Sequence, residues 1–289
     1  MLVYILSRGE KLYSTSRIYQ TSLSRRHNTR VIDHMECDLF IEDGTYKVVF
    51  NDEVLLKPDM IIPRIGSSAT YYGTSVVRHF EMMGCKVLNP SMAIQNSRDK
   101  FRSLQILMAN GIRVPTTFFS YDMHYAQSVV ERRLGYPFII KVLEGTQGNG
   151  VHLVKNEEMA EKLIQRLNPK KKQIILQEFI EEFSGKDIRA LVVGDQVVAS
   201  YMRIAKGGDF RSNIHRGGTG KMVHLTFEEK SLAINAVKCL GLKCAGVDIL
   251  RSKKGSMVIE VNSSPGLEGV EKYTKIDVAR KIIEHIEMI

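Results

Sequence analysis

Short apolar runs recur along the chain and alternate with stretches in which apolar residues follow a helical spacing. Leu2–Leu6 and Met60–Pro63 have the composition of buried strands, and residues 16–26 and 74–83 have that of helices. Strands that alternate with helices indicate a parallel sheet with covered faces, whose ligands gather at the carboxyl ends of the strands. The first third of the chain is therefore predicted to be an α/β domain, with a small hairpin at residues 47–56.

The rest of the chain carries a mixed pattern of helices and strands joined by short turns. Strands are predicted at residues 116–119, 138–143, 151–154 and 174–179, and helices at residues 122–134 and 157–167. Gly194 and Asp195 form a two-residue hairpin turn, and Thr226 with Glu229 forms a capping box that starts a helix. A polar segment at residues 91–100 precedes this part. The sequence predicts an α/β and α+β fold with domains at residues 1–94, 95–175 and 176–289.

A hairpin near the end of the chain carries acids inside apolar runs. Residues 247–250 and 257–261 are rich in β-branched residues, and the turn residues between them predict that the two strands pair. Asp248 then lies opposite the second strand, where Glu260 and Asn262 share one face. Hard divalent cations bind such oxygen ligands together with substrate phosphates, so we expect a metal site for a nucleotide. Ordinary edge-strand acids are the alternative, but the apolar flanks indicate partly buried carboxylates that need a cation.

Phosphate binding is predicted around a glycine-dense segment. Residues 145–150 join two strands, and glycine permits both close approach of the backbone to a ligand and positive φ angles, as in a flap over phosphates. Lys141 lies in the apolar strand before this flap, where an ammonium group requires an anion. Neither a Walker motif nor a complete G-x-G-x-x-G pattern is present. The strand end at Gln177 and Glu178 suits an adenine edge and ribose hydroxyls.

Residues 203–221 combine cations and glycines with little periodicity and are predicted to be a mobile anion-binding loop. The candidates for holding phosphates or an acyl phosphate are Arg203, Lys206, Arg211 and Arg216, with Ser212 and Asn213 as neutral donors. A basic RNA contact or a disordered loop is the alternative. Arg64, after the strand Met60–Pro63, is either a substrate carboxylate ligand or a solvated loop arginine.

Composition narrows the class of protein. The chain has 289 residues, 44% of them hydrophobic, which suits a globular protein with two or three subdomains. Its net charge of +9 fits anionic partners such as nucleotides, acidic substrates or RNA, but surface lysines that aid solubility would give the same value. The four cysteines lack metal-site spacing and are expected to be reduced and buried. Without a signal peptide or an apolar run of membrane-spanning length, the expected compartment is the cytoplasm.

Several motifs together resemble the RimK-like family of ATP-grasp ligases. They are Arg98-Asp99-Lys100, KVLEGTQGNGV, QEFIEE, Asp187-Ile188-Arg189, DFRSNIHRGG, Gly246-Val247-Asp248 and EVNSSPGLEG, with ILSRG and IIPRIG in the first third. Each is weak alone, but their order across nearly the whole chain is specific. The resemblance implies an N-terminal pre-ATP-grasp domain followed by two α+β lobes that grip ATP.

The resemblance also implies roles for individual residues. It implies phosphate contacts for Lys100, Lys141, Arg211, Ser212 and Asn213, a phosphate-covering flap with Gly145, Gly148 and Gly150, an adenine and ribose pocket at Glu178, Phe179 and Asp187, and a Mg²⁺ or Mn²⁺ site, with two ions expected, at Asp248, Glu260 and Asn262. We add Arg203 as the residue that steadies an acyl phosphate and the tetrahedral oxyanion.

The reaction implied is addition of L-glutamate to a carboxylate at the C-terminus of a ribosomal protein, with ATP consumed through an acyl phosphate. Glutamate transfer to a small-molecule cofactor or peptide is an alternative with the same nucleotide machinery. A non-enzymatic RNA- or ribosome-binding module is an alternative of another class, which leaves the acid hairpin unexplained. The acceptor and the oligomeric state, including a homo-oligomer, stay open.

Overall fold

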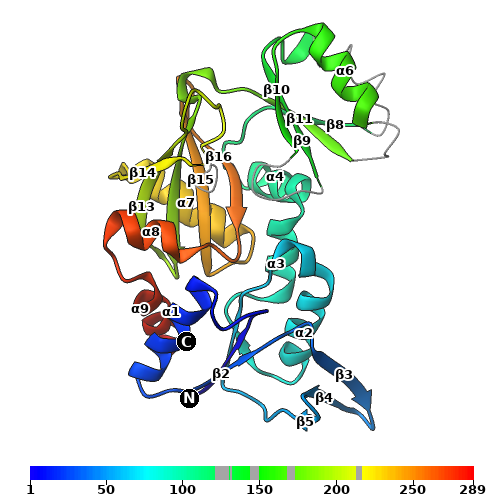
Figure 1. The fold of residues 1–289 in the computed structure, drawn as a ribbon, viewed down its shortest axis with the longest axis vertical. Helices are drawn as coiled ribbons and strands as arrows, with labels where there is room; N and C mark the ends of the chain where they lie inside the picture. The colour runs from blue at the N-terminus through cyan, green and yellow to red at the C-terminus, as the bar shows by residue number, and fades with distance from the viewer. Residues whose placement is uncertain (121–129, 131, 144–149, 168–172, 213–216) are drawn as a thin grey trace.

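The computed structural model describes residues 1–120, 130, 132–143, 150–167, 173–212 and 217–289. These residues form three lobes that are arranged around a column made of two short helices, α3 (Ser91–Arg98) and α4 (Lys100–Ala109) (Figure 1). No helix in the described part of the chain is both long enough and apolar enough to cross a membrane.

The N-terminal lobe contains the predicted parallel sheet. Its strand order is β2-β1-β6-β7, with bounds β1 (Leu2–Leu6), β2 (Asn28–Ile32), β6 (Met60–Pro63) and β7 (Lys86–Val87). Because side chains alternate along a strand, Val3 and Ile5 enter one buried cluster with Ile18 of α1 (Tyr13–Ser24), and Tyr4 enters another with Phe80 of α2 (Thr70–Met82). The α/β prediction for this lobe is confirmed.

Two local predictions in this lobe need correction. The predicted hairpin is present as β4 (Thr45–Phe50) and β5 (Glu53–Val54), but β3 (Cys37–Glu42) also pairs with β4 and was missed because its exposed residues mix acids with apolar side chains. The polar segment at residues 91–100, for which no element was predicted, contains helix α3, since Ala93 and Ile94 are buried on one side of it. A 3-10 turn, η1 (Ser67–Ala69), precedes α2.

The central lobe is a four-stranded antiparallel sheet covered by a helix. The strand order is β10-β9-β11-β8, with bounds β8 (Thr117–Phe119), β9 (Phe138–Val142), β10 (Val151–Val154) and β11 (Ile174–Glu178), and the helix is α6 (Glu157–Leu167). Ile140 and Ile164 belong to a buried cluster that joins α6 to the sheet. Most of the predicted helix at residues 122–134 lies outside the described residues. The predicted domain boundary after residue 175 falls inside β11.

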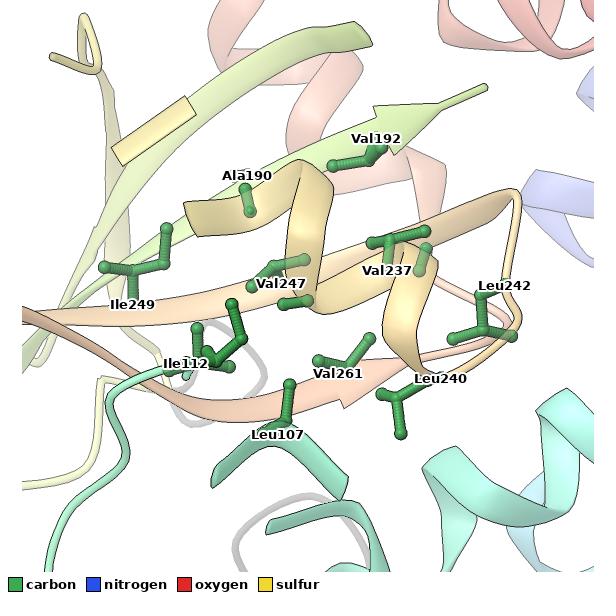
Figure 2. Close-up of a cluster of buried hydrophobic side chains, with 14 of the residues drawn as sticks. Leu107, Ile112, Ala190, Val192, Val237, Leu240, Leu242, Val247, Ile249 and Val261 are labelled. Atoms are coloured by element: carbon green, nitrogen blue, oxygen red, sulfur yellow. The ribbon is translucent and has the colours of Figure 1, made fainter. Parts of the chain in front are cut away.

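The C-terminal lobe is a five-stranded antiparallel sheet with helices on both faces. The strand order is β14-β13-β12-β15-β16, with bounds β12 (Lys186–Val193), β13 (Gln196–Ile204), β14 (Thr219–Met222), β15 (Cys244–Ser252) and β16 (Gly255–Asn262); the helices are α7 (Phe227–Cys239), α8 (Leu267–Thr274) and α9 (Val278–Met288), and η3 (Glu181–Phe183) is a 3-10 turn. Figure 2 shows α7 and α4 packing on one buried cluster, which contains Leu107, Val237 and Val261. The capping box of Thr226 and Glu229 that starts α7 is confirmed.

The segment from Arg203 to Lys221 is only partly the irregular loop that its composition predicts. β13 continues through Ile204, and β14 pairs with it from Thr219 to Met222 at the edge of the sheet. Backbone pairing does not depend on side-chain pattern, which explains why a glycine-containing edge strand escaped detection. Of the cationic residues in this segment, Arg203 lies on β13 and Lys221 lies on β14.

Candidate active site

The acid hairpin has the predicted register. β15 and β16 pair antiparallel, Asp248 lies opposite Glu260, and a bulge follows directly after Asp248. Val261 points to the other face and is 1% exposed. Pairing across the sheet adds two more positions to the same row, because Asp248 also lies opposite Arg189, and Asp187 lies opposite Arg203.

This row of side chains forms a buried ion network. Arg189 donates to both carboxylate oxygens of Asp248, and its Nη2–Oδ2 distance is 2.8 Å. Arg203 donates to Asp187, with an Nε–Oδ1 distance of 2.6 Å, and its Nη2 also donates to Asp248 at 2.8 Å. Burial would raise the pKa of Asp248, but the two guanidinium groups lower it below its ordinary value. Asp248 is therefore an ionised carboxylate held in a fixed orientation.

Arg189 is a site residue to which sequence reasoning gave no role. The signal that could have identified it is the two-residue spacing from Asp187, which places both side chains on one face of β12. Gly246 makes room for it, since a Cβ there would lie 2.9 Å from Arg189 Cδ. Asp187 itself was assigned to the ribose pocket by resemblance, whereas its carboxylate in the structure binds Arg203.

Glu260 differs from its predicted environment. The apolar flanks predicted a partly buried acid, but Glu260 is exposed because it stands on the edge strand β16 and points away from the core that holds Val261. It makes no hydrogen bond or ion pair with the residues that the structure describes. Its negative charge acts on Lys100 and Lys141 instead, where it opposes the loss of the lysine protons.

Lys100 and Lys141 bring two ammonium groups to the same region from different elements. Lys141 on β9 donates to Gln177 Oε1 at 2.5 Å, and Lys100 at the start of α4 donates to the carbonyls of Val142 and Leu143 at 3.2 Å. Burial, together with repulsion from Lys100, lowers the pKa of Lys141 to about 8 despite the attraction of Glu260. Burial also lowers the pKa of Lys100. A bound anion would stabilise both ammonium groups.

A cavity of about 1210 Å³ lies between the central and C-terminal lobes. Phe179 and Arg211 line it, and Phe179 contacts Phe210 edge to face at 6.4 Å between ring centroids. Arg211 pairs with Asp209 at 2.9 Å. Lys100, Lys141, Asp248 and Glu260 are absent from the described lining residues, but Val151, which lines the cavity, pairs with Lys141 between β10 and β9.

The remaining predicted nucleotide residues are only partly described. Glu178 accepts hydrogen bonds from the Thr116 backbone and from Lys254, and Ser212 is buried. Gly150 has a φ of +89°, and a Cβ there would lie 3.1 Å from Val142 Cβ, so its backbone position requires glycine. Gly145, Gly148, Asn213 and Arg216 lie outside the described residues.

Asn262 ends β16, and the backbone of the next residue, Ser263, is hydrogen-bonded to Asn89 of the N-terminal lobe. The Asn89 side chain donates to the carbonyls of Cys244 and Ser263 at 2.6 and 3.0 Å and accepts from the backbone of Lys243 and Cys244 at 2.8 Å. The Asn262 amide itself has a buried nitrogen without a hydrogen-bond partner among the described residues. The oxygen and nitrogen of an Asn side chain are assigned from their hydrogen bonds, and this unbonded nitrogen has none. A flip of the amide would place the oxygen at the same position, where it can serve as a ligand.

Arg64 is not a solvated loop arginine. It is partly buried, and its Nη2 donates to the Pro265 carbonyl at 2.7 Å. Burial lowers its pKa to about 10.

Comparison with known proteins identifies relatives along the whole chain. Residues 1–94 match the RimK PreATP-grasp domain, and residues 97–286 match the RimK-like ATP-grasp domain. A probable alpha-L-glutamate ligase of Vibrio vulnificus (strain YJ016) is 51% identical over 99% of this chain and 95% of its own length. A probable alpha-L-glutamate ligase of Coxiella burnetii (strain RSA 493 / Nine Mile phase I) is 48% identical with the same coverage.

Solved structures share the fold. The ATP-grasp ligase PsnB in complex with its minimal precursor has a TM-score of 0.77 at 20% identity, covering 99% of this chain and 98% of that chain. A RimK domain ATP-grasp protein from Sphaerobacter thermophilus DSM 20745 has a TM-score of 0.74 at 18% identity, with 99% of both chains covered. These likenesses confirm the predicted ATP-grasp architecture with an N-terminal pre-ATP-grasp domain.

Proposed function

The chain belongs to the RimK-like ATP-grasp family of ATP-dependent ligases, and from that premise we propose that it joins the amino group of L-glutamate to a carboxylate at the C-terminus of a ribosomal protein. In the first step a carboxylate oxygen of the acceptor attacks the γ-phosphorus of ATP, and ADP leaves. In the second step the glutamate amine attacks the acyl carbon, phosphate leaves and an amide forms. Neither step requires a nucleophile from the protein.

The observation that carries this proposal is the meeting of Lys100 and Lys141 with Glu260 across the two lobes. Two partly buried ammonium groups with lowered pKa values form a site for a highly charged anion, which a nucleotide triphosphate supplies. Phe179 and Arg211 line the adjoining cavity and are suited to a base and to phosphate oxygens. Glu178, Ser212 and Asn213, together with the flap at Gly145, Gly148 and Gly150, complete the proposed nucleotide site. Asp187 is retained as a neighbour of the ribose.

The residues of the acid hairpin fit a hard divalent cation. Glu260 offers a carboxylate without a bonded partner among the described residues, and Asn262 carries the unbonded amide atom. Asp248 is ionised, but both of its oxygens accept from guanidinium groups, so it would have to exchange one of these bonds for the ion. Two carboxylates and an amide are the donor types that Mg²⁺ and Mn²⁺ bind, and PsnB is described in complex with Mg and ADP. When bound, such ions would offset the negative charge of the phosphate oxygens, and two ions are proposed.

Arg203 is proposed to stabilise the charge of the acyl phosphate and of the tetrahedral intermediate. Its attraction to Asp248 and Asp187 raises its pKa well above the ordinary value even though burial opposes this, so the guanidinium stays charged. The same acids fix its orientation, and an oriented charge stabilises a developing oxyanion without reorganisation.

A peptide or protein acceptor is favoured over a small-molecule acceptor. PsnB and the macrocyclase MdnC, which share the fold, are described with precursor peptides. Mass spectrometry of ribosomal proteins and of small metabolites after incubation with ATP, Mg²⁺ and labelled glutamate distinguishes the two acceptor classes. A mass gain of one or more glutamyl units on a ribosomal protein C-terminus is the expected result, and label only in small metabolites would contradict it.

Replacing Glu260 tests the proposed metal and phosphate site. The change Glu260→Gln should lower glutamate-dependent ADP release at least about 100-fold, as expected for loss of an oriented charge at a reacting group. The fold should persist because the side chain is exposed. Glu228→Gln, an exposed acid of the same lobe on α7, serves as the matched control and should leave ADP release unchanged. Full glutamate-dependent turnover by Glu260→Gln would contradict the assignment.

A further inference from the structure

Three arginines gather where the N-terminal lobe faces the end of β16. Arg8 follows β1 and Arg64 follows β6, so both stand at the carboxyl edge of the parallel sheet, and Arg98 ends α3. The Arg8 guanidinium lies against Gly66, where a Cβ would be 3.5 Å from Nη2. Arg64 and Arg98 are close enough for their charges to repel. We name these three residues the arginine cluster.

The arginine cluster has no carboxylate partner among the described residues. Arg64 donates to the Pro265 carbonyl at 2.7 Å, and Arg98 donates to the Ile65 carbonyl at 2.6 Å. Elsewhere in the described chain partly buried arginines pair with acids, as Arg17 does with Glu271 at 3.1 Å. The pairs of the same kind are Arg25 with Glu287, Arg189 with Asp248, Arg203 with Asp187 and Arg251 with Glu229. Burying a cation without an anion is costly, so the partly buried Arg64 and Arg98 are the exceptions that need an explanation, whereas Arg8 is exposed.

Four unbonded polar atoms belong to Arg98 and to the segment that precedes Pro265, the residue that Arg64 contacts. Seven buried side-chain atoms in the described chain lack a hydrogen-bond partner, and four of them belong to Arg98 (Nε), Asn262 (Nδ2), Ser263 (Oγ) and Ser264 (Oγ). Asn262 ends β16, and Ser263 and Ser264 form the bend that leads from it to Pro265, to which Arg64 is bonded. Buried polar groups in proteins are normally satisfied, so this concentration marks a place prepared for a polar ligand.

We propose that Arg64, Arg98, Ser263 and Ser264, with Arg8 at the margin, form a subsite for a non-reacting carboxylate of the acidic substrate. The inference rests on the proposed function, because glutamate and an acidic acceptor terminus both carry carboxylates besides the one that reacts. Guanidinium groups bind a carboxylate through paired hydrogen bonds, and serine hydroxyls add neutral donors. Glu260 lies nearby and acts electrostatically on Arg98, so a carboxylate held here stands next to the proposed phosphate and metal site.

Amide analogues of the substrate test the subsite. The variants Arg64→Met and Arg98→Met are assayed for ADP release with three amino acids. They are glutamate, glutamine, in which a neutral amide replaces the γ-carboxylate, and isoglutamine, in which a neutral amide replaces the α-carboxylate. The unaltered enzyme should prefer glutamate to the amide of the bound carboxylate by about tenfold or more, as expected for a charge-assisted hydrogen bond. Each Met variant should raise the KM for glutamate by a similar factor and lose this preference, with a smaller effect on kcat. Arg78→Met, an exposed arginine of α2, is the matched control and should change neither quantity.

A second set of assays separates the two possible sources of the carboxylate. Acceptor peptides that end in glutamate or in glutamine are compared in the same variants at saturating L-glutamate. Loss of preference between the acceptors, with the KM for L-glutamate unchanged, assigns the subsite to the acceptor. Loss of preference between the amino acids assigns it to the co-substrate.

Arg64→Lys and Arg98→Lys are the conservative variants that guard against a folding defect, since they keep the charge but lose the paired donors. If the Met variants do not fold, these variants carry the test and should raise the KM of the bound substrate several-fold. An unchanged KM and unchanged preferences for every substrate, in folded variants of an enzyme that is otherwise active, would overturn the subsite alone. Absence of glutamate-dependent ADP release in the unaltered protein would overturn the proposed function and the subsite with it.

Discussion

The N-terminal and C-terminal lobes share one buried core, whereas the central lobe has its own. Val3, Ile5 and Met60 of the N-terminal lobe belong to the same cluster as Leu191 and Ile282 of the C-terminal lobe. Polar contacts reinforce this joint body, because α1 binds α8 and α9 through bonds to Glu271, Asp277 and Glu287. In Figure 1, α1 and α9 lie side by side at this junction.

The central lobe is attached more sparsely. Its cluster around Ile140 is separate, and of the described central-lobe residues Ile175 joins the buried cluster of the C-terminal lobe. The contact between Glu178 and Lys254 is an ion pair at 3.1 Å with an exposed lysine, a kind that contributes little to stability. Figure 1 shows this lobe standing apart from the other two.

This difference explains how the proposed site is divided. Glu260, Asp248 and the arginine cluster stand on the joint body, and Lys141 stands on the central lobe. Lobes that close over ligands come from the less strongly attached parts of a protein. The structure therefore divides the site between the joint body and a lobe that has its own core.

Core truncation in each region gives the largest expected effect. Ile140→Ala in the central lobe and Ile5→Ala in the joint body remove fully buried side chains and should each cost about 2–5 kcal/mol of local stability. Hydrogen exchange measured by mass spectrometry should show Ile140→Ala exposing β9 and α6 while β12 stays protected. Ile5→Ala should instead expose both β1 and α9. Equal loss of protection in all three lobes for Ile140→Ala would break the comparison.

The Asn89 clamp gives a smaller effect that is specific to the joint body. Asn89→Asp keeps the acceptors but removes both donors, which leaves the carbonyls of Cys244 and Ser263 facing a carboxylate. The expected cost in urea unfolding is about 2–3 kcal/mol.

The matched control for this change is Asn156→Asp in the central lobe. Asn156 accepts from the Met159 backbone at the start of α6, and an aspartate can do the same, so the free energy of unfolding should change by less than about 0.5 kcal/mol. Equal costs for the two changes would mean that the clamp does not distinguish the regions.

Deprotonation of Lys141 gives the smallest expected effect, and it reports on contact between the two regions. Its ammonium group loses its proton as the pH rises through about 8, so ATP affinity should fall above that pH, by up to about tenfold per unit. Titration calorimetry from pH 7 to 9.5 measures this. Lys141→Arg remains charged and should lose most of the pH dependence. If the wild-type affinity stays constant to pH 9.5, Lys141 is not buried between the lobes in the binding-competent form.

The sequence by itself determined the local elements and the chemistry that they carry. The acid hairpin, the turn at Gly194 and the capping box of Thr226 are specified by neighbouring residues, and each is present in the structure. Glu260 and Asn262 share one face of β16 by alternation alone, and the hairpin register places Asp248 opposite Glu260. The exposure of the Glu260 side chain could not be predicted in this way, since it depends on which strand lies at the sheet edge.

Only the tertiary structure decided which distant residues meet. The row from Arg203 through Asp187 and Arg189 to Asp248 is completed by the pairing of β12 with β15, two strands that are not consecutive in the chain. Arg64 reaches Pro265 after β16 because the N-terminal and C-terminal lobes share a core. Local patterns encode strands and turns, whereas register and lobe docking arise from burying apolar surface between segments far apart in sequence.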